Sequence, residues 1–534
     1  MRIKMSNPYL GFRGGVLEIV ERPRISLWRG AALGVFILLI LSAAKAQSPS
    51  QMVTGPTRPI QLPLSGSEGP AQPGSVTVTE QTTNTGGGGA VNTINSSVNV
   101  QPPFNGSNPS APGASGTLTL TLEKALADGL RYNLGVLSQA SSVLQMRGQR
   151  KVVRSELLPN LNGAVSEEFE RLNLRTMGVE SPTFPESVKF NFYDARAARL
   201  QQTVFDLVKV ENLRSASESL KASFKQVQST RDLVVLAVGG SYLQLLATNA
   251  RIRAAQAQVD TSRAIYQQAK DRFALGLASR IDVSRPQVQL QVEELRLRSL
   301  QADLETQSLR MARIIGLPLD QQFVAVDEFD FVPLSNVTMD EARHTAQKQR
   351  PDLQAATSAV KAAESAVKAA RAERLPSLAV NADFGAAGIT PSHESTGVYS
   401  VSGTLTIPLY EGGRIQGDIE RAQAALRERQ AELENLNGQV DQDVRQAFID
   451  LGLAADQVNM AKSDVDLAKD ILTQSRDRFS VGVADTVEVV QAEQTVVQAD
   501  DDYITAIFQH NLAKVSLARA LGNAEQSLPQ LLRK

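Results

Sequence analysis

The sequence contains the stretch Asp271-Arg272-Phe273-Ala274-Leu275-Gly276-Leu277-Ala278 and repeats it 206 residues later as Asp477-Arg478-Phe479-Ser480-Val481-Gly482-Val483-Ala484. The two copies align without a gap over residues 238–316 and 444–522. A repeat of this length indicates one structural unit that is used twice. The fold therefore depends on what this doubled unit builds.

A long helix is predicted before each copy of this stretch. In the second copy, large apolar residues recur every seven positions over 444–479, and small residues recur three positions after them over 447–475. The first copy carries the same two lines over 238–273 and 241–269. This heptad predicts coiled packing with a left-handed supercoil. Each helix is expected to span about 65–70 residues, or roughly 100 Å at 1.5 Å per residue, which a globular core does not need.

The repeated stretch itself is predicted to be a tight turn, because Gly276 and Gly482 suit the positive φ that closes a helix. The following helices begin with Ser279-x-x-Asp282 and Asp485-x-x-Glu488, each an N-cap residue followed by an acidic residue at N3. These return helices run only about 35 residues, as does an opening helix at about 120–157. Two half-length helices stacked end to end would match one long helix.

After the opening helix of each copy, the apolar period changes to two, which predicts a pair of strands. The pairs are expected at 378–384 and 399–409 in the second copy and at 161–171 and 187–205 in the first. The predicted unit has two strands at one end, a helical shaft, and a hairpin tip at the other end. We place the first repeat at 117–337 and the second at 338–534.

The N-terminal residues are typical of an exported protein. An apolar run at 31–41 follows several arginines and precedes Ala44-Lys45-Ala46, which fits a signal peptide at 1–46. Residues 47–116 are rich in Pro, Gly, Ser, Thr and Asn and are expected to be a disordered extension. An uncleaved anchor helix is the alternative for the apolar run. No later segment is expected to be a transmembrane helix.

Composition argues against several classes of function. The chain of 534 residues has a net charge of −1. This balance gives no reason to expect nucleic-acid binding, which requires a basic patch. It has no cysteine, which excludes disulfides and thiolate metal sites. Its three histidines, His344, His393 and His510, are far apart in the sequence. We expect no catalytic residues, no cofactor and no metal site, and hence no enzyme.

The strands raise the question of stoichiometry. Four strands cannot close a barrel, and an open sheet edge in lipid is too costly. Membrane barrels need at least eight strands, so three chains with twelve strands are the simplest solution, although two chains are not excluded by counting. The alternating strands suit a wall between membrane lipid and an aqueous lumen.

Three signatures occur twice in the same order. They are Leu158-Pro159 and Leu375-Pro376 before the strands, Phe205-Asp206 and Tyr410-Glu411 before the long helices, and the Asp-Arg-Phe-x-x-Gly turns. Together they resemble the TolC-like outer-membrane efflux proteins over about 118–522. The resemblance implies a mainly α fold that trimerises into a twelve-stranded membrane β-barrel and a periplasmic α-helical barrel. It also implies a periplasmic adaptor protein and an inner-membrane transporter as partners, for efflux or type I secretion.

The same resemblance implies that both hairpin tips contact the adaptor. The residues concerned are Leu275, Gly276, Leu277, Ala278 and Ser279 in the first tip, and Val481, Gly482, Val483, Ala484 and Asp485 in the second. A purely structural role, in which these residues only turn the chain, is the alternative.

The resemblance also implies an acidic ring at a constriction just after the second tip. Glu488 matches that position, Gln491 follows one turn later, and Asp282 is the counterpart of Glu488 in the first copy. Three Glu488 side chains would attract cations at a narrow mouth. The alternative is that Glu488 and Asp282 cap their own helices at N3, and both roles are compatible. No clear match exists for a basic residue that locks the closed state in some family members.

The competing interpretation is a periplasmic structural coiled coil or an adaptor. Adaptors have long helical hairpins, but usually a single hairpin flanked by β-rich modules. The duplicated strand pair favours the channel.

Overall fold

The computed structural model describes residues 76–82, 94–109, 116–178, 185–334, 338–389 and 395–532. All of them belong to one compact unit that comprises residues 70–534. The predicted signal peptide lies outside the described residues, as does His393.

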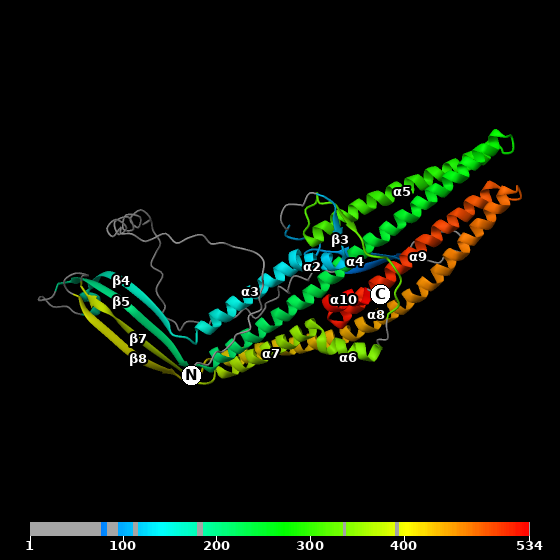
Figure 1. Ribbon diagram of the computed structural model, residues 1–534. Helices are drawn as coiled ribbons and strands as arrows, with labels where there is room; N and C mark the ends of the chain where they lie inside the picture. The colour runs from blue at the N-terminus through cyan, green and yellow to red at the C-terminus, as the bar shows by residue number, and fades with distance from the viewer. Residues whose placement is uncertain are drawn as a thin grey trace, which may run out of the picture. The chain divides into compact units, whose positions relative to one another are not determined.

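The two long helices and their return helices form as predicted. Helices α4 (Leu207–Ala274) and α8 (Arg414–Ser480) contain 68 and 67 residues, and α5 (Arg280–Ile315) and α9 (Thr486–Leu521) contain 36 each. Each pair makes a hairpin, and the two hairpin tips lie at the same end of the helices (Figure 1).

Half-length helices stack along the long ones, which confirms the prediction that two of them together match one long helix. Helices α3 (Leu134–Ser155) and α5 both pack on α4, and α7 (Pro351–Ala372) and α9 both pack on α8. Helix α4 also packs on α7 and α9. The order across the wall is therefore α3 and α5, then α4, then α7 and α9, then α8. Helix α4 is an interior helix, whereas α8 lies at an edge.

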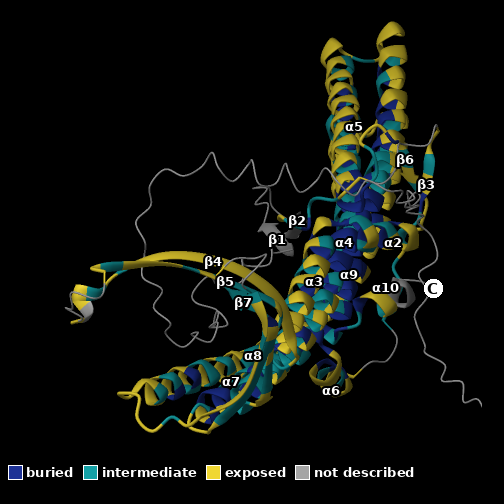
Figure 2. Cartoon of the chain, turned by 90° about the vertical axis from the view of Figure 1, so that its left-hand side faces the viewer, coloured by how far each residue is buried: buried dark blue, intermediate teal, exposed yellow. Residues whose placement is uncertain are grey.

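This difference explains how the two heptads are buried. All the predicted heptad residues of α8 from Val444 to Phe479, large and small, are buried. Helix α4 buries a wider set, including the run from Val234 to Val238, because it has neighbours on both sides. Figure 2 shows this buried region where α4 and α9 lie side by side. Phe273, in contrast, is 47% exposed, so the heptad prediction is wrong at that position.

Helix α4 also contains a window long and apolar enough to span a membrane, contrary to our expectation for the residues after the N-terminus. In the structure 72% of that window is buried against other helices. Its apolar character is accounted for by the packing of an interior helix on two sides.

The opening helix is broken in both copies, whereas one continuous helix was expected at about 120–157. Helices α2 (Leu122–Tyr132) and α3 meet at Asn133, which is fully buried. Its side-chain amide donates to the carbonyl oxygens of Phe104 and Ile314, and its oxygen caps α3. In the second copy α6 (Met339–Gln349) and α7 meet at the buried Arg350, which pairs with Asp352 and Asp443.

The strand pairs join into one antiparallel sheet at the end of the helices away from the tips (Figure 1). Its order is β4 (Asn160–Asn173), β5 (Ser187–Phe205), β7 (Ser377–Gly388) and β8 (Ser395–Thr406), with the short helix η1 (Leu174–Met177) after β4. Strand β8 ends before Pro408, which has no N–H for a ladder hydrogen bond. Strands β4 and β8 are left as the outer strands of this sheet.

Part of the predicted disordered extension is ordered, so the prediction for 47–116 is wrong there. Strands β1 (Val76–Thr82) and β2 (Ile94–Val100) pair antiparallel over seven residues and contact α4. The following Phe104 is 1% exposed and belongs to the main core. The segment is ordered because its two strands pair with each other and pack on α4, and its polar composition gave no sign of this. The remaining elements are β3 (Leu118–Leu120), parallel to β6 (Phe323–Ala325), and the C-terminal α10 (Ala524–Leu532).

Candidate functional site

The two hairpin tips have the same backbone. Gly276 and Gly482 have φ of 74° and 80°, the left-handed region that favours glycine. In the first tip Leu277 N–H donates to the carbonyl oxygen of Arg272 at 2.8 Å, and in the second Val483 N–H donates to that of Arg478 at 2.9 Å. The predicted turns are therefore correct in position and geometry.

Each tip presents two large apolar side chains to the outside. They are Leu275, Leu277, Val481 and Val483, which are 68–74% exposed. Nothing in the helical core requires these side chains, since the turns are closed by backbone hydrogen bonds and glycine. They form an exposed apolar surface on the pair of tips.

A side chain of the first tip holds the second. Arg272 donates from Nη1 to the carbonyl oxygen of Phe479 at 2.8 Å, and its guanidinium lies 4.7 Å from the centre of the Phe479 ring. Phe479 is 7% exposed. The equivalent Arg478 instead pairs with Glu488 at 3.4 Å. Arg272 was not predicted as a locking residue, although its place in the repeated Asp-Arg-Phe stretch was a signal.

Asp282 closes the start of α5 as a capping box. Its Oδ2 accepts from Ser279 N–H at 2.8 Å and from Ser279 Oγ at 2.6 Å. The hydrogen bond from the Ser279 side chain, followed by that from its N–H, lowers the pKa of Asp282. Asp282 is thus an ionised carboxylate at neutral pH, and its predicted capping role is confirmed.

Glu488 does not close a capping box, so that part of its prediction is wrong. Asp485 caps α9 alone by accepting from the N–H groups of Val487 and Glu488 at 3.0 and 3.1 Å. The Glu488 side chain is left free to turn toward Arg478, which lies on α8 across the second hairpin. Gln491 is exposed one turn further along α9.

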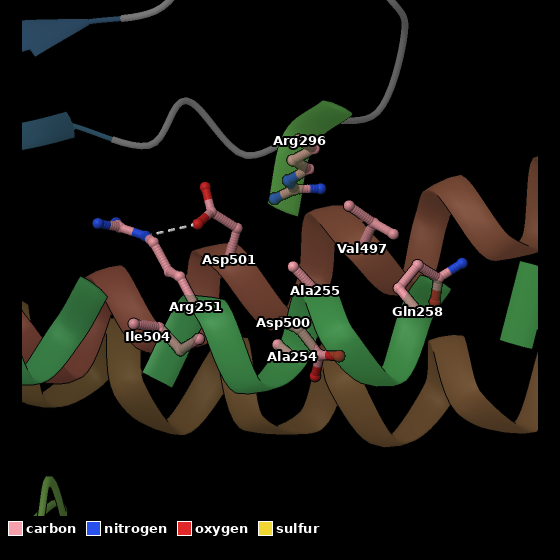
Figure 3. Close-up of a pocket in the computed structure, with 9 residues that line it drawn as sticks. All are labelled: Arg251, Ala254, Ala255, Gln258, Arg296, Val497, Asp500, Asp501 and Ile504. Carbon is pink, nitrogen blue, oxygen red and sulfur yellow. Dashed lines mark hydrogen bonds and ion pairs between the residues drawn. The ribbon is translucent and has the colours of Figure 1, made fainter. Parts of the chain in front are cut away.

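A seam between the two hairpins runs back from the tips along α4 and α9. Arg251 of α4 donates from Nε to Asp501 of α9 at 2.7 Å and from Nη2 to Thr505 at 2.7 Å. Figure 3 shows this ion pair beside a small cavity of about 20 Å³, with Arg296 of α5 on the same side. These bonds join the first hairpin to the second within one chain.

Between this ion pair and the tips, the seam contains two buried carboxylates. Glu293 of α5 is 4% exposed and Glu493 of α9 is 1% exposed. Burial, against the attraction of Arg476, raises the pKa of Glu493 to about 7. Neither Glu293 nor Glu493 was predicted from the sequence. The signal for Glu493 was a charged residue in the apolar stripe of α9 between Val489 and Val496.

The two histidines in the described part of the chain, His344 and His510, do not form a site. His344 is exposed, and His510 is 1% exposed with its ring 4.6 Å from that of Phe331. Burial lowers the pKa of His510 to about 4. Over the described ranges, no three histidine, aspartate or glutamate side chains gather as a metal site would require.

Doubled strand pairs, long coiled hairpins and two matched tips define the class of outer-membrane export channels. The chain belongs to the outer membrane efflux protein family, whose model matches residues 129–317 and 342–523. The predicted resemblance is therefore confirmed. The family is one of transport conduits, and the chain is an outer-membrane channel component for efflux or secretion.

Among known relatives, the pyoverdine export outer membrane protein OpmQ of Pseudomonas aeruginosa is 23% identical over 410 residues, 76% of this chain and 86% of OpmQ. Outer membrane protein TolC of Escherichia coli is 22% identical over 415 residues, 73% of this chain and 84% of TolC. The crystal structure of the outer membrane protein VceC of Vibrio cholerae has the same fold. Its TM-score is 0.65 at 18% identity, over 75% of this chain and 96% of VceC.

Proposed function

We propose that three copies of this chain close into one continuous channel, a twelve-stranded barrel in the outer membrane that leads into a periplasmic tube of helices. The observation that carries this proposal is a pair of exposed heptad stripes on the two outer helices of the wall. Substrates would cross the channel passively, without chemistry.

The first stripe lies on α5 and the second on α8. On α5 it consists of Ile281, Val288, Leu295, Ala302 and Leu309, and all five are exposed. On α8 it contains Leu453, Met460 and Leu467, which are 51–61% exposed, and Val481 of the adjoining tip, 74% exposed, continues the same spacing. Members of each stripe are separated by multiples of seven residues, the spacing of a coiled-coil seam.

The two stripes lie on opposite edges, since α5 packs on α4 and α8 packs on α9. Joining α8 of one copy to α5 of the next is a head-to-tail contact, which closes into a ring when the rotation allows it. The same ring would join strand β8 of one copy to β4 of the next. Three copies would supply twelve strands and leave no edge exposed to lipid.

The sheet has the side chains that a membrane wall needs. In β8, Tyr399, Val401 and Leu405 are 60–80% exposed and alternate with Ser400, Ser402 and Thr404. Successive side chains of a strand point to opposite faces, so one face is apolar and the other polar. This supports contact with lipid outside and with water inside.

At the other end, the tips are proposed to bind a periplasmic adaptor, through which the channel would meet an inner-membrane transporter. The exposed Leu275, Leu277, Val481 and Val483 support this, with Gly276, Ala278, Ser279, Gly482, Ala484 and Asp485 shaping the turns. Asp282, Glu488 and Gln491 are proposed to line the constriction. We further propose that residues 1–46 are a signal peptide, and that the first repeat ends at residue 337 and the second begins at residue 338.

Paired cysteines test the ring, because the chain has no cysteine of its own. Leu295 lies 15 residues after the start of α5 and Leu467 lies 13 before the end of α8, so the two are at similar height. Oxidation of the L295C/L467C variant in membranes should give a covalent ladder that ends at the trimer. A ladder that ends at the dimer, or none, contradicts the proposal. Each single variant serves as the control.

A further inference from the structure

The seam between the hairpins contains a polar cluster to which all four tip-proximal helices contribute. It consists of Ser262 from α4, Gln289 and Glu293 from α5, Arg476 from α8, and Glu493 and Gln494 from α9. We call these six residues the seam cluster. Glu493 begins the third turn of α9, so the cluster lies roughly 10 Å from the tips.

The Glu493 side chain, at the centre of the seam cluster, is enclosed largely by apolar side chains. Val489 and Val496, one turn before and one turn after Glu493, are 0% and 6% exposed, and they pack in one core with Ile265 and Leu472. Ser262 is 1% exposed. Water does not reach the carboxylate of Glu493 while the seam is packed.

The hydrogen bonds in the seam cluster do not satisfy its two carboxylates. Glu293 Oε1 accepts from Gln289 Nε2 at 2.7 Å, while its Oε2 has no hydrogen bond to any described residue. Glu493 Oε2 accepts from Ser262 Oγ at a long 3.5 Å, and its Oε1 lies 3.9 Å from Arg476 Nη2, without a hydrogen bond within the described part of the chain. A buried ionised carboxylate this poorly paired is costly.

The charged groups that face Glu493 are opposed in sign. Arg476 of α8 lies in the same hairpin as Glu493 and is 41% exposed, which weakens its attraction. Glu293 comes from α5 in the other hairpin, and α4 contributes only the neutral Ser262 hydroxyl. An ionised Glu493 therefore repels the Glu293 carboxylate across the seam.

We propose that the seam cluster is a proton-operated latch, which holds the two hairpins together when Glu493 is protonated and favours their separation when Glu493 loses its proton. Separation lets water reach both carboxylates and removes their repulsion. The consequence for the pore rests on the proposed channel function, since parting the hairpins at their tips would widen the constriction. The latch itself is a property of one chain.

The direction of the effect follows from the raised pKa of Glu493. In the packed seam the carboxyl keeps its proton up to about pH 7, whereas a hydrated carboxyl loses it near the ordinary value of 4.5. Opening thus releases a proton between these limits, and the ratio of open to closed seams should rise by up to about tenfold per pH unit. Above about pH 7 the ratio levels off.

Pulsed electron paramagnetic resonance tests the latch without any transport assay. Spin labels at L277C and V483C report the distance between the two tips of one chain when labelled chains are diluted with unlabelled ones. In the wild type the ratio of separated to packed tips should rise about fortyfold from pH 5 to pH 7, since the rise already levels off near the pKa of the packed carboxyl. E493Q, neutral at every pH, should remove this dependence, and E293Q should weaken it.

The matched control is E305Q, which neutralises an exposed carboxylate on α5 and should behave as the wild type. A tip distance that does not change with pH in the wild type overturns the latch, as does an undiminished dependence in E493Q. Neither result bears on whether the protein forms a channel. Conversely, failure of the cysteine ladder would remove the channel ring and leave this measurement valid.

Discussion

The first and second hairpin tips have the same turn but different side-chain contacts. Both close with a glycine at positive φ and share the backbone hydrogen bond from the residue after that glycine to the carbonyl oxygen of the arginine. Arg272, however, reaches across to Phe479, whereas Arg478 pairs within its own hairpin. Phe479 is buried and Phe273 is half exposed. The backbone of the turn is the same in both copies, but the surroundings of each copy differ. As a result, Arg272 of the first tip binds Phe479 beside the second tip, and the reverse contact is not made among the described residues.

The position of each hairpin in the wall accounts for this difference. Helix α4 is interior and has neighbours on both sides, while α8 is an edge helix with one buried face. The last turn of α4 can therefore direct Arg272 toward the second hairpin. The last turn of α8 uses its buried face for Phe479, while Asp477, Arg478 and Ser480 on its other sides are exposed.

The largest predicted effect is the difference in stability loss between alanine substitutions at Phe479 and at Phe273. Phe479→Ala removes a buried ring and should lower the stability of the tip region by about 3–5 kcal/mol. Phe273→Ala removes a half-exposed ring and should cost about 1 kcal/mol or less. Thermal unfolding of the two purified variants makes the comparison. Equal losses would mean that the two tips are packed alike.

A smaller difference is predicted for the two arginines. Arg272→Ala removes a charge-assisted hydrogen bond and a cation–π contact, and should cost about 1–3 kcal/mol. Arg478→Ala removes an exposed ion pair worth about 0–1 kcal/mol. The rate of limited proteolysis within the tips reports this difference, with Arg272→Ala cleaved faster. If Arg478→Ala is cleaved as fast, the assignment of the lock to the first tip is wrong.

The smallest effect is predicted for the carboxylates of the proposed constriction. Glu488→Gln should lower cation selectivity by on the order of twofold, because salt screens exposed charges beyond about 10 Å at 0.1 M. Asp282→Asn should change selectivity no more, but it also weakens the capping box of α5. The reversal potential across a planar bilayer measures both variants. Unchanged selectivity in Glu488→Gln would remove its role in the pore.

The sequence was sufficient for the features that repeat locally. Seven-residue spacing placed the buried lines of α8, and Gly276 and Gly482 marked both turns, because these patterns depend on neighbours within a few residues. The alternation of apolar and polar residues placed β5 and β7 for the same reason. The family followed from these features in their order.

The sequence was insufficient where partners lie far apart in the chain. Arg272 and Phe479 are 207 residues apart, and no local pattern shows that one reaches the other. Asn133 interrupts the opening helix because of Phe104 and Ile314, which are also distant. Glu493 occupies a position of an apolar stripe, and only the packed seam reveals what its burial implies.

Single-channel conductance in planar bilayers tests the central claim, that the first tip locks the second, most directly. Wild type, Arg272→Ala and Arg478→Ala would be recorded under the same salt and pH. We predict that Arg272→Ala spends more time in high-conductance states, while Arg478→Ala conducts as the wild type does. If the two variants conduct alike, or if only Arg478→Ala opens, the account is contradicted.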